Sequence, residues 1–329
     1  MITLKDVTKE SAVEGVTVLI EKRQEQITKA GKPYLSLVVR DKATSMNAKL
    51  WDYSAAKHGA VAEGSVVNIW ATVDEFAGAL QLNIKDIGEA LGDANEFYKK
   101  TRFDVEAMWG DLVNLVGTFQ EPLTKFVCEE LLLKHEAFIS AFKKAPAAKS
   151  VHNAWYGGLL EHVHSLTTIA DPIIKHYQTR YLEKISRDKV MFGLIMHDAG
   201  KIIEYDYNKP SFDMTGVGIF TNHLVLGPAW VYEKANLFMA EFLANHGTAE
   251  KFKMERAHLM HVLAAHHGQI AWGSPVVPAS IEAVLVHHLD NLDAKVLHAL
   301  EHVEGKASTI KGFSERSRIE GTPFYQYTI

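Results

Sequence analysis

The sequence has very little cysteine and no long hydrophobic run. Cys128 is the one cysteine in 329 residues, which excludes an intrachain disulfide and fits a reducing compartment. No stretch approaches the roughly 18 consecutive apolar residues of a membrane-spanning helix, so we expect no membrane partner. Residues 1–7 show no basic stretch leading into an apolar core, so we expect no secretory signal and a cytoplasmic location.

An excess of positive charge is also missing. The net charge of −5 does not indicate a general nucleic-acid binder, because attraction to phosphates favours a basic surface. Histidine, in contrast, is abundant: there are 17, and most lie in the second half of the chain. This bias favours metal or proton chemistry. The length is typical of two domains of roughly 100–200 residues each.

Residues 1–95 have the pattern of short β-strands. Segments rich in Val, Ile, Leu and aromatic residues alternate with turn-forming residues, and we predict strands at 13–27, 34–41, 46–51, 66–73 and 79–84. Five short strands in fewer than a hundred residues predict a small closed barrel, with a five-stranded Greek-key barrel as the first choice.

The segments 32–41, 48–52, 64–69 and 80–84 resemble an OB-fold of the nucleic-acid-binding type. The resemblance implies that aromatic side chains stack on bases and that basic side chains lie near phosphates; the candidates are Tyr34, Trp51, Trp70 and Phe76 for stacking, and Arg40 and Lys49 for phosphates. Alternatively, Trp51 and Trp70 are core aromatics of the barrel. Eleven Lys and Arg stand against thirteen Asp and Glu in this part, so binding of single strands would be weak or limited to a local patch.

Residues 96–150 change to helical periodicity. Apolar residues recur at helical spacing from 103 to 116, and Pro122 is well placed at the start of a second helix. We interpret this segment as a helical connector that packs as a scaffold and carries no chemistry.

Residues 151–329 bring His and Asp onto several separate apolar helices. His197 and Asp198 follow directly on an apolar run, and isolated histidines or carboxylates end other apolar stretches: His162, His223, His266, His267 and Asp290. A single His on an apolar helix, such as His223, has the alternative of a hydrogen-bonded core residue. Burying all of these groups separately would repeat the desolvation cost, whereas one metal centre satisfies them together. His164, His258, His261, His287, His288 and His302 fit this pattern less well, and we expect them at the surface or behind the ligands.

The order of these residues resembles the HD-domain superfamily of metal-dependent phosphohydrolases and, within it, the YhaM family. The motifs that carry the second resemblance span nearly the whole chain: residues 146–152, Gly157-Gly-Leu-Leu-Glu-His162, His197-Asp-Ala-Gly-Lys201, His223-Leu-Val-Leu-Gly227, His266-His-Gly268, Trp272-Gly-Ser-Pro275 and Asp290-Asn-Leu-Asp-Ala-Lys295. It departs at Asn153, where the family usually has a second histidine after His152.

The resemblance implies a multi-domain α+β protein, with an N-terminal five-stranded OB-fold barrel (1–95), the connector (96–150) and an all-α HD-type phosphohydrolase domain (151–329). It implies a 3′→5′ exoribonuclease that releases nucleoside 5′-monophosphates, with single-stranded DNA as a further substrate.

The resemblance also implies the roles of the site residues. The first metal is held by His162, His197, Asp198 and Asp290, and the second by His223, His266 and His267, with Asp198 as the bridge. Asp198 and Lys201 are the catalytic candidates, and Lys201, one turn further along the same helix, contacts a phosphate oxygen. Imidazole-rich ligation favours manganese, iron, cobalt or zinc over magnesium, and the resemblance implies manganese, as one or two ions.

Two other classes of function stay open. The same centre would serve a phosphohydrolase of small substrates such as cyclic dinucleotides, short oligonucleotides or nucleotides. A non-catalytic nucleic-acid-binding protein would keep the helical domain only as a scaffold. The expected partners are therefore single-stranded RNA or DNA, or a small nucleotide, and a homo-oligomer is a further expectation.

Overall fold

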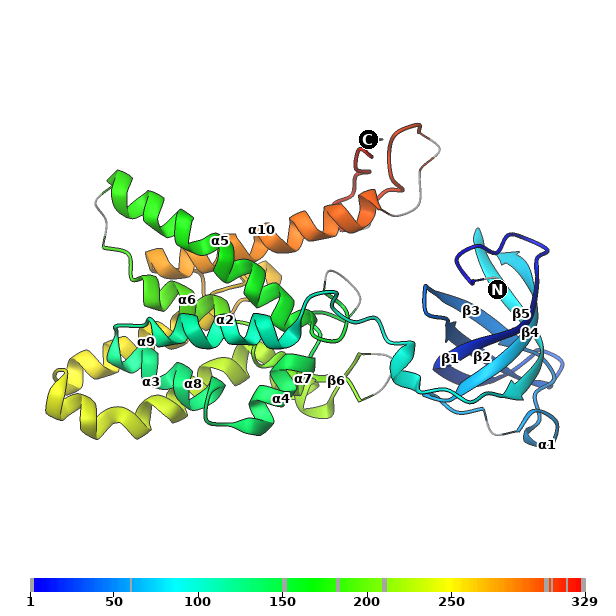
Figure 1. Cartoon of the computed structure of the whole chain (residues 1–329), viewed down its shortest axis with the longest axis horizontal. Coiled ribbons are helices and arrows are strands. Elements are labelled where there is room, and N and C mark those ends of the chain that lie inside the picture. The colour runs from blue at the N-terminus through cyan, green and yellow to red at the C-terminus, as the bar shows by residue number, and fades with distance from the viewer. Residues whose placement is uncertain are drawn as a thin grey trace. The chain divides into compact units, whose positions relative to one another are not determined.

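The computed structural model describes residues 3–59, 61–149, 153–181, 184–208, 212–304, 308, 310–317 and 319–326. The chain divides into two compact units (Figure 1). One comprises Met1–Lys100 and Asp206–Asp213, and the other comprises Thr101–Tyr205 and Met214–Ile329.

The first unit is a closed β-barrel. Its strands are β1 (Ala12–Ile27), β2 (Pro33–Arg40), β3 (Ser45–Leu50), β4 (Val66–Phe76) and β5 (Ala79–Glu89), and the short helix α1 (Ala55–His58) lies between β3 and β4 in the chain. The strands close in the order β1-β2-β3-β5-β4, with β3 and β5 parallel and the other neighbours antiparallel. This order is that of the five-stranded Greek-key OB-fold, so the predicted barrel is confirmed.

Strict alternation of side chains builds the barrel core. In β2, Leu35, Leu37 and Val39 point inward and are buried, whereas the residues that alternate with them, Tyr34, Ser36 and Val38, are only half-buried. β1 is long enough to pair with both β2 and β4, and its register shifts on each side bend it around the barrel. One face of β2 and β3 therefore lies on the outside of the barrel.

The second unit is helical. Its elements are α2 (Val105–Gly117), α3 (Pro122–Leu132), α4 (Glu136–Lys144), α5 (Gly158–Tyr181), α6 (Arg187–Met196), α7 (Lys201–Glu204), α8 (Gly216–Asn245), α9 (Ala249–Ala264) and α10 (Ile281–Val303). Short elements complete the chain: the 3-10 turns η1 (Ala94–Glu96) and η2 (Ile270–Trp272), and the strands β6 (Tyr205–Asp206) and β7 (Asp213–Met214), which pair with each other. The predicted helical region after the barrel is confirmed, and Pro122 opens α3 as expected.

Helix α6 is the centre of this unit. It is buried along almost its whole length from Val190 to Met196 and packs against α3, α5, α9 and α10. A helix surrounded on all sides must be apolar all round, which explains the uninterrupted apolar run before His197. The run therefore delivers His197 and Asp198 into the interior.

Helices α2, α3 and α4, which come from the predicted connector, cluster with the rest of the helical unit. The functional division at residues 95 and 150 stays a prediction. Among the described helices, none combines the length and apolar character that a membrane crossing requires.

Candidate metal centre and nucleic-acid surface

The first potential ligand group joins three helical segments that are far apart in the sequence. His162 from α5, His197 at the end of α6 and Asp290 from α10 offer ligand atoms that all lie within 4.8 Å of one another. Both histidines are buried, and Nε2 of His162 lies 3.2 Å from Oδ1 of Asp290. The geometry is that of side chains that converge on one point.

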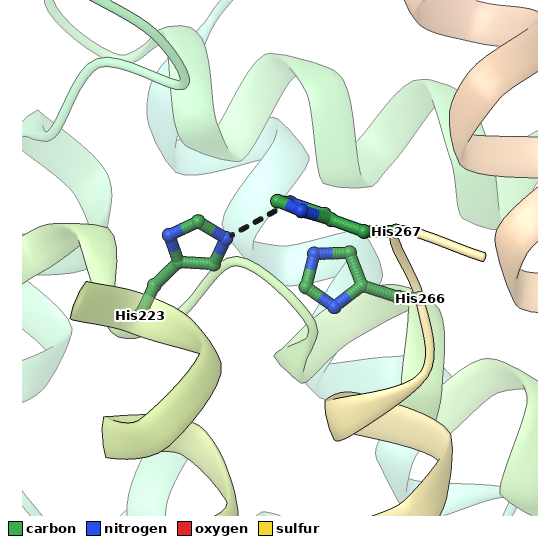
Figure 2. A group of neighbouring side chains, drawn as sticks. All are labelled: His223, His266 and His267. Carbon is green, nitrogen blue, oxygen red and sulfur yellow. Dashed lines mark hydrogen bonds between the residues drawn. The ribbon is translucent and has the colours of Figure 1, made fainter. Parts of the chain in front are cut away.

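A second group lies on α8 and at the end of α9. His223, His266 and His267 also offer nitrogens within 4.8 Å of one another. Figure 2 shows the three rings pointing toward one another. Nε2 of His223 lies 3.3 Å from Nε2 of His267. Three imidazoles facing one point form a typical set of ligands for a transition metal.

Asp198 lies between the two groups. Its Oδ2 is 3.4 Å from Nε2 of His197 in the first group, and its Oδ1 is 3.5 Å from Nε2 of His223 in the second. Oδ1 is also 3.8 Å from Nε2 of His266. One carboxylate therefore faces both groups, each with a different oxygen.

The five histidines share one orientation. Each uses Nδ1 for a hydrogen bond to the protein, which leaves Nε2 for the centre. The partners of Nδ1 are Asp293 for His162 (2.8 Å), the Leu194 carbonyl for His197 (3.0 Å), Glu204 for His223 (2.6 Å), the Leu263 carbonyl for His266 (2.6 Å) and the Trp272 carbonyl for His267 (2.9 Å). A carbonyl accepts only from a protonated Nδ1, so in a neutral imidazole bound this way the lone pair is on Nε2.

These residues fit a divalent metal ion. Nε2 of His197 and Nε2 of His266 are buried, and neither has a hydrogen-bond partner among the described residues. Leaving buried polar atoms without partners is costly, and a cation at the centre would satisfy both nitrogens. The donor set of imidazoles and carboxylates is also suited to such an ion.

The electrostatics of the centre lead to the same conclusion. Burial lowers the pKa of His197, but the carboxylates of Asp198 and Asp290 outweigh it and raise this pKa to about 10. Burial raises the pKa of Asp198, but Lys201 and His197 hold it well below its ordinary value. The pKa of His266 falls well below its usual range because of burial and the neighbouring charge of His197. The buried carboxylates thus require positive charge nearby, which protons or a metal can supply.

Lys201 is hydrogen-bonded to Asp198, with Nζ 2.6 Å from Oδ2. The prediction that both lie on the same helix is wrong, because α6 ends at Met196 and α7 begins at Lys201. The residues between them, His197 to Gly200, form a turn. This turn places Lys201 beside the centre, with its side chain largely buried.

Close packing explains glycine in two of the motifs. A Cβ on Gly158, at the start of α5, would lie 2.0 Å from the carbonyl oxygen of Asn153. A Cβ on Gly200 would lie 2.6 Å from Cα of His223. Asn153 itself is buried with a φ of +53°, and its side-chain amide has no hydrogen-bond partner among the described residues. His152 lies outside the described residues.

Helix α8 is broken immediately before His223. Asn222 has non-helical angles (φ 46°, ψ 173°), and its Oδ1 accepts a hydrogen bond from the N–H of Leu224 at 3.0 Å. The expected continuous apolar helix around His223 is therefore interrupted. The N–H of His223 is freed from helical bonding and donates to Glu204 at 2.8 Å. The break thus fixes the position of this histidine.

Two carboxylates that support the histidines were given no role from the sequence, although Asp293 lies within the quoted motif of residues 290–295. Glu204 holds His223, and Asp293 holds His162 while accepting a second bond from Ser165 (2.6 Å). Asp293 follows Asp290 by three residues and so lies on the same side of α10, which was a usable signal. Glu204 carried no such signal, because its partner is 19 residues away on another helix.

On the barrel, three of the predicted nucleic-acid-binding residues form one surface. The rings of Tyr34 and Trp51 are 4.7 Å apart, and Nζ of Lys49 lies 5.1 Å from the centre of the Tyr34 ring. Trp51 is 47% exposed, and its Nε1 donates to Asn83 at 3.3 Å. One exposed and one half-buried aromatic ring beside an ammonium group are suited to stacking on bases and attracting a phosphate.

The other aromatic and basic candidates lie elsewhere on the barrel. Arg40 is at the opposite end of β2 from Tyr34, and its Nε donates to Glu21 at 2.5 Å, which neutralises its charge. Phe76 ends β4 and is 74% exposed. Trp70 lies over Gly15 and Gly88, but its side chain is 39% exposed, so the alternative that Trp51 and Trp70 are core aromatics of the barrel is wrong.

Comparison with known proteins gives two relatives that match over nearly the full length. The chain is 31% identical over 318 residues to the 3′-5′ exoribonuclease YhaM of Geobacillus sp. (strain WCH70), a match that covers 94% of this chain and 91% of that protein. It is 28% identical over 321 residues to the 3′-5′ exoribonuclease YhaM of Bacillus subtilis (strain 168), covering 94% of each.

Matches among solved structures are confined to part of the chain. The second OB-fold domain of replication protein A from Methanococcus maripaludis matches with 18% identity and a TM-score of 0.21, over 28% of this chain and 98% of that domain. The OB domain of Ta0387 from Thermoplasma acidophilum matches with 18% identity and a TM-score of 0.22, over 28% and 88%. No family model matches the chain.

Proposed function

The chain belongs to the YhaM family of 3′-5′ exoribonucleases, and we propose that its helical unit performs this reaction at an HD-type metal centre. The reaction shortens single-stranded RNA from the 3′ end and releases nucleoside 5′-monophosphates. The proposed metal ligands are His162, His197, Asp198, His223, His266, His267 and Asp290.

The position of Asp198 between the two ligand groups carries this proposal. Its two oxygens face His197 at 3.4 Å and His223 at 3.5 Å, as a carboxylate that bridges two cations would. When bound, such cations lower the pKa of water and neutralise charge on phosphoryl oxygens. Two-cation sites of this kind are a recurrent solution for phosphodiester cleavage.

Lys201 has a separate role in this proposal. Its ammonium group lies 2.6 Å from Asp198 and lines the cavity at the centre. As a point charge, it attracts a non-bridging oxygen of the scissile phosphate and orients the phosphodiester. Glu204 and Asp293 act only through the histidines that they hold, and so they are positioning residues.

Manganese is the proposed metal. Five imidazoles among the proposed ligands favour manganese, iron, cobalt or zinc over magnesium, which prefers oxygen ligands. Relative activities with each metal chloride added to metal-free protein would decide among them.

The barrel is proposed to hold the single strand. Tyr34 and Trp51 stack on successive bases, and Lys49 lies beside a phosphate. Arg40 and Phe76 lie apart from this surface, so they would contact only nucleotides outside the segment that Tyr34, Lys49 and Trp51 bind. We also expect the protein to form a homo-oligomer, and its mass in analytical sedimentation tests this expectation.

A product analysis tests the proposed reaction. Protein with manganese is incubated with 5′-labelled single-stranded RNA, with the same sequence as DNA, and with cyclic and short oligonucleotides; the double variant His197→Ala/Asp198→Ala is the control. A ladder of 3′-shortened RNA with release of 5′-monophosphates, absent from the variant, is expected. Cleavage of small nucleotides with intact RNA would instead favour the small-substrate phosphohydrolase, which the small size of the cavity (about 290 Å³) would also accommodate.

A further inference from the structure

A recess adjoins the metal centre and has a second wall to which no role has been assigned. Its volume is about 290 Å³. Its lining includes residues of the centre, such as Asp198 and Lys201, and three further residues that we call its second wall: Trp272, His287 and Asn291. This volume is at the lower end of the roughly 300–1,000 Å³ of small-molecule sites, which suits a single nucleotide rather than several stacked bases.

Helix α10 carries most of this wall on one face. His287, Asp290, Asn291 and Ala294 are spaced at i, i+3, i+4 and i+7, so they lie side by side along the helix, and all four line the recess. Asp290 is a proposed metal ligand, so the residues beside it are held at a fixed distance from the centre. Ala294 has a small side chain and leaves the recess open at that point.

His287 presents a hydrogen-bond acceptor to the recess. The side chain is 9% exposed, and its Nδ1 lies 2.7 Å from the carbonyl oxygen of His266. That carbonyl can only accept, so Nδ1 carries the proton and Nε2 has the lone pair. Among the described residues, none is hydrogen-bonded to Nε2. A donor from a ligand in the recess would complete it.

Trp272 supplies an aromatic face at the mouth of the recess. Its side chain is 50% exposed, and its ring centre is 6.0 Å from that of His287. The loop beneath it is rigid, because the buried Ser274 donates to the Val276 carbonyl at 2.7 Å and the Trp272 carbonyl accepts from Nδ1 of His267 at 2.9 Å. Trp272 takes part in the last bond only through its main-chain carbonyl, so replacing the indole leaves the orientation of His267 intact.

Asn291 completes the wall with a group that can both donate and accept. It is half-buried, and its amide forms no hydrogen bond with the described part of the chain. The recess therefore offers an aromatic ring, a hydrogen-bond acceptor and an amide, which are groups that bind the base and the sugar of a nucleoside. The adjoining metal centre is suited to bind the phosphate of the same nucleotide.

We propose that Trp272, His287 and Asn291 form the subsite for the nucleoside of the 3′-terminal nucleotide. The indole stacks on the base, Nε2 of His287 accepts a hydrogen bond from a ribose hydroxyl, and the Asn291 amide contacts the nucleoside beside it. This assignment rests on the proposed exonuclease function. Contact with the 2′-hydroxyl would also make the wall a determinant of preference for ribose, since 2′-deoxyribose lacks that donor.

Binding of the reaction product tests the subsite without turnover. The dissociation constants of AMP, 2′-deoxyAMP, 3′-deoxyAMP and ribose 5-phosphate for the manganese-loaded full chain are measured by calorimetry. We expect ribose 5-phosphate, which lacks the base, to bind about tenfold more weakly than AMP, as for loss of one stacking contact. We expect one deoxy analogue to bind about fivefold more weakly than AMP, and which one it is identifies the hydroxyl that His287 contacts.

Variants assign these differences to single side chains. Trp272→Ala should remove the difference in dissociation constant between AMP and ribose 5-phosphate, and Trp272→Phe should retain most of this difference. His287→Phe should remove the difference between AMP and the deoxy analogue, whereas His288→Phe, on the neighbouring exposed position, should not. Ala294→Leu fills the recess without breaking any hydrogen bond and should weaken AMP binding at least tenfold while manganese binding is unchanged.

The outcomes separate this proposal from the proposed function. Equal affinity of wild-type protein for all four compounds, or unchanged discrimination in Trp272→Ala and His287→Phe, would overturn the subsite even if RNA is shortened from its 3′ end. Discrimination that the variants abolish supports the subsite, and RNA that nevertheless stays intact would overturn only the exonuclease function. Manganese binding by each variant shows that the centre is preserved, so a loss of AMP affinity is not a loss of fold.

Discussion

A single carboxylate oxygen of Glu204 holds His223 at two points: it accepts from the backbone N–H at 2.8 Å and from Nδ1 at 2.6 Å. Both groups are buried. The two bonds fix the position of the residue and the direction of its ring, so Nε2 must face the centre. This arrangement is the carboxylate–histidine pairing that accompanies metal ligands in proteins.

Replacing Glu204 should therefore weaken the second group of ligands. We expect Glu204→Ala to reduce manganese affinity about 10–100-fold, as for loss of comparable supporting carboxylates. Calorimetric titration of metal-free protein measures this change. Glu233→Ala, at an exposed glutamate of α8, is the control, and equal affinities in the two variants would contradict the role given to Glu204.

Gly200 should tolerate no side chain. A methyl group there would lie 2.6 Å from Cα of His223, so the backbone of α7 or α8 must move, and we expect Gly200→Ala to cost about 1–3 kcal/mol of the free energy of unfolding. Manganese binding should weaken as well. Gly110→Ala in α2 meets no atom within 4 Å and should stabilise the protein by about 0.5–1 kcal/mol. The free energies of unfolding of both variants in urea check this difference. An unchanged free energy of unfolding in Gly200→Ala would contradict the prediction.

The barrel surface should bind single-stranded RNA through stacking and one charge. Trp51→Ala should weaken binding by about 1–3 kcal/mol, with Trp51→Phe retaining part of the affinity. Lys49→Ala should reduce the slope of log affinity against log salt by about one, since one phosphate contact is lost. Fluorescence anisotropy with labelled RNA measures both, with Leu91→Ala, a fully exposed residue beyond β5, as the control. Unchanged affinity of Trp51→Ala would place the strand elsewhere.

Glu282 should contribute to stability in a defined range of pH. Burial raises its pKa, but the hydrogen bond of His258 and the backbone N–H of Ser186 (2.9 Å) outweigh it and lower this pKa from 4.5 to about 2. Because the folded-state pKa is the lower one, the contribution is complete above pH 4.5 and is lost as the pH falls toward 2. The stability difference between wild-type protein and Glu282→Gln should shrink across that range in urea unfolding, and Glu233→Gln should show no such trend.

Removal of metal should lower stability. A ligand present at about 100 times its dissociation constant stabilises a folded protein by about 2.7 kcal/mol, so chelation should lower the melting temperature and manganese should restore it. The double variant His197→Ala/Asp198→Ala should show no response to manganese. A wild-type melting temperature that is insensitive to manganese would argue against a metal held by the folded centre.

The sequence was sufficient where local pattern decides structure. Alternation in segments such as Tyr34 to Arg40 predicted the strands of the barrel, and the apolar run before His197 predicted a buried helix. It was insufficient where distant segments meet. The pairing of Glu204 with His223, the neutralisation of Arg40 by Glu21 and the turn that separates Asp198 from Lys201 depend on packing between elements, which periodicity does not encode.

Helix α10 links a proposed metal ligand and the lining of the recess, which could otherwise change independently of each other. It carries Asp290 and, on the same face, His287 and Asn291, so a one-residue insertion between positions 287 and 290 would rotate His287 by about 100° relative to the other two. Related chains can therefore diversify this face only by substitution, never by length. The loop that carries Trp272 contacts His267 through the main-chain carbonyl of Trp272, so the side chain at this position can change without moving that histidine.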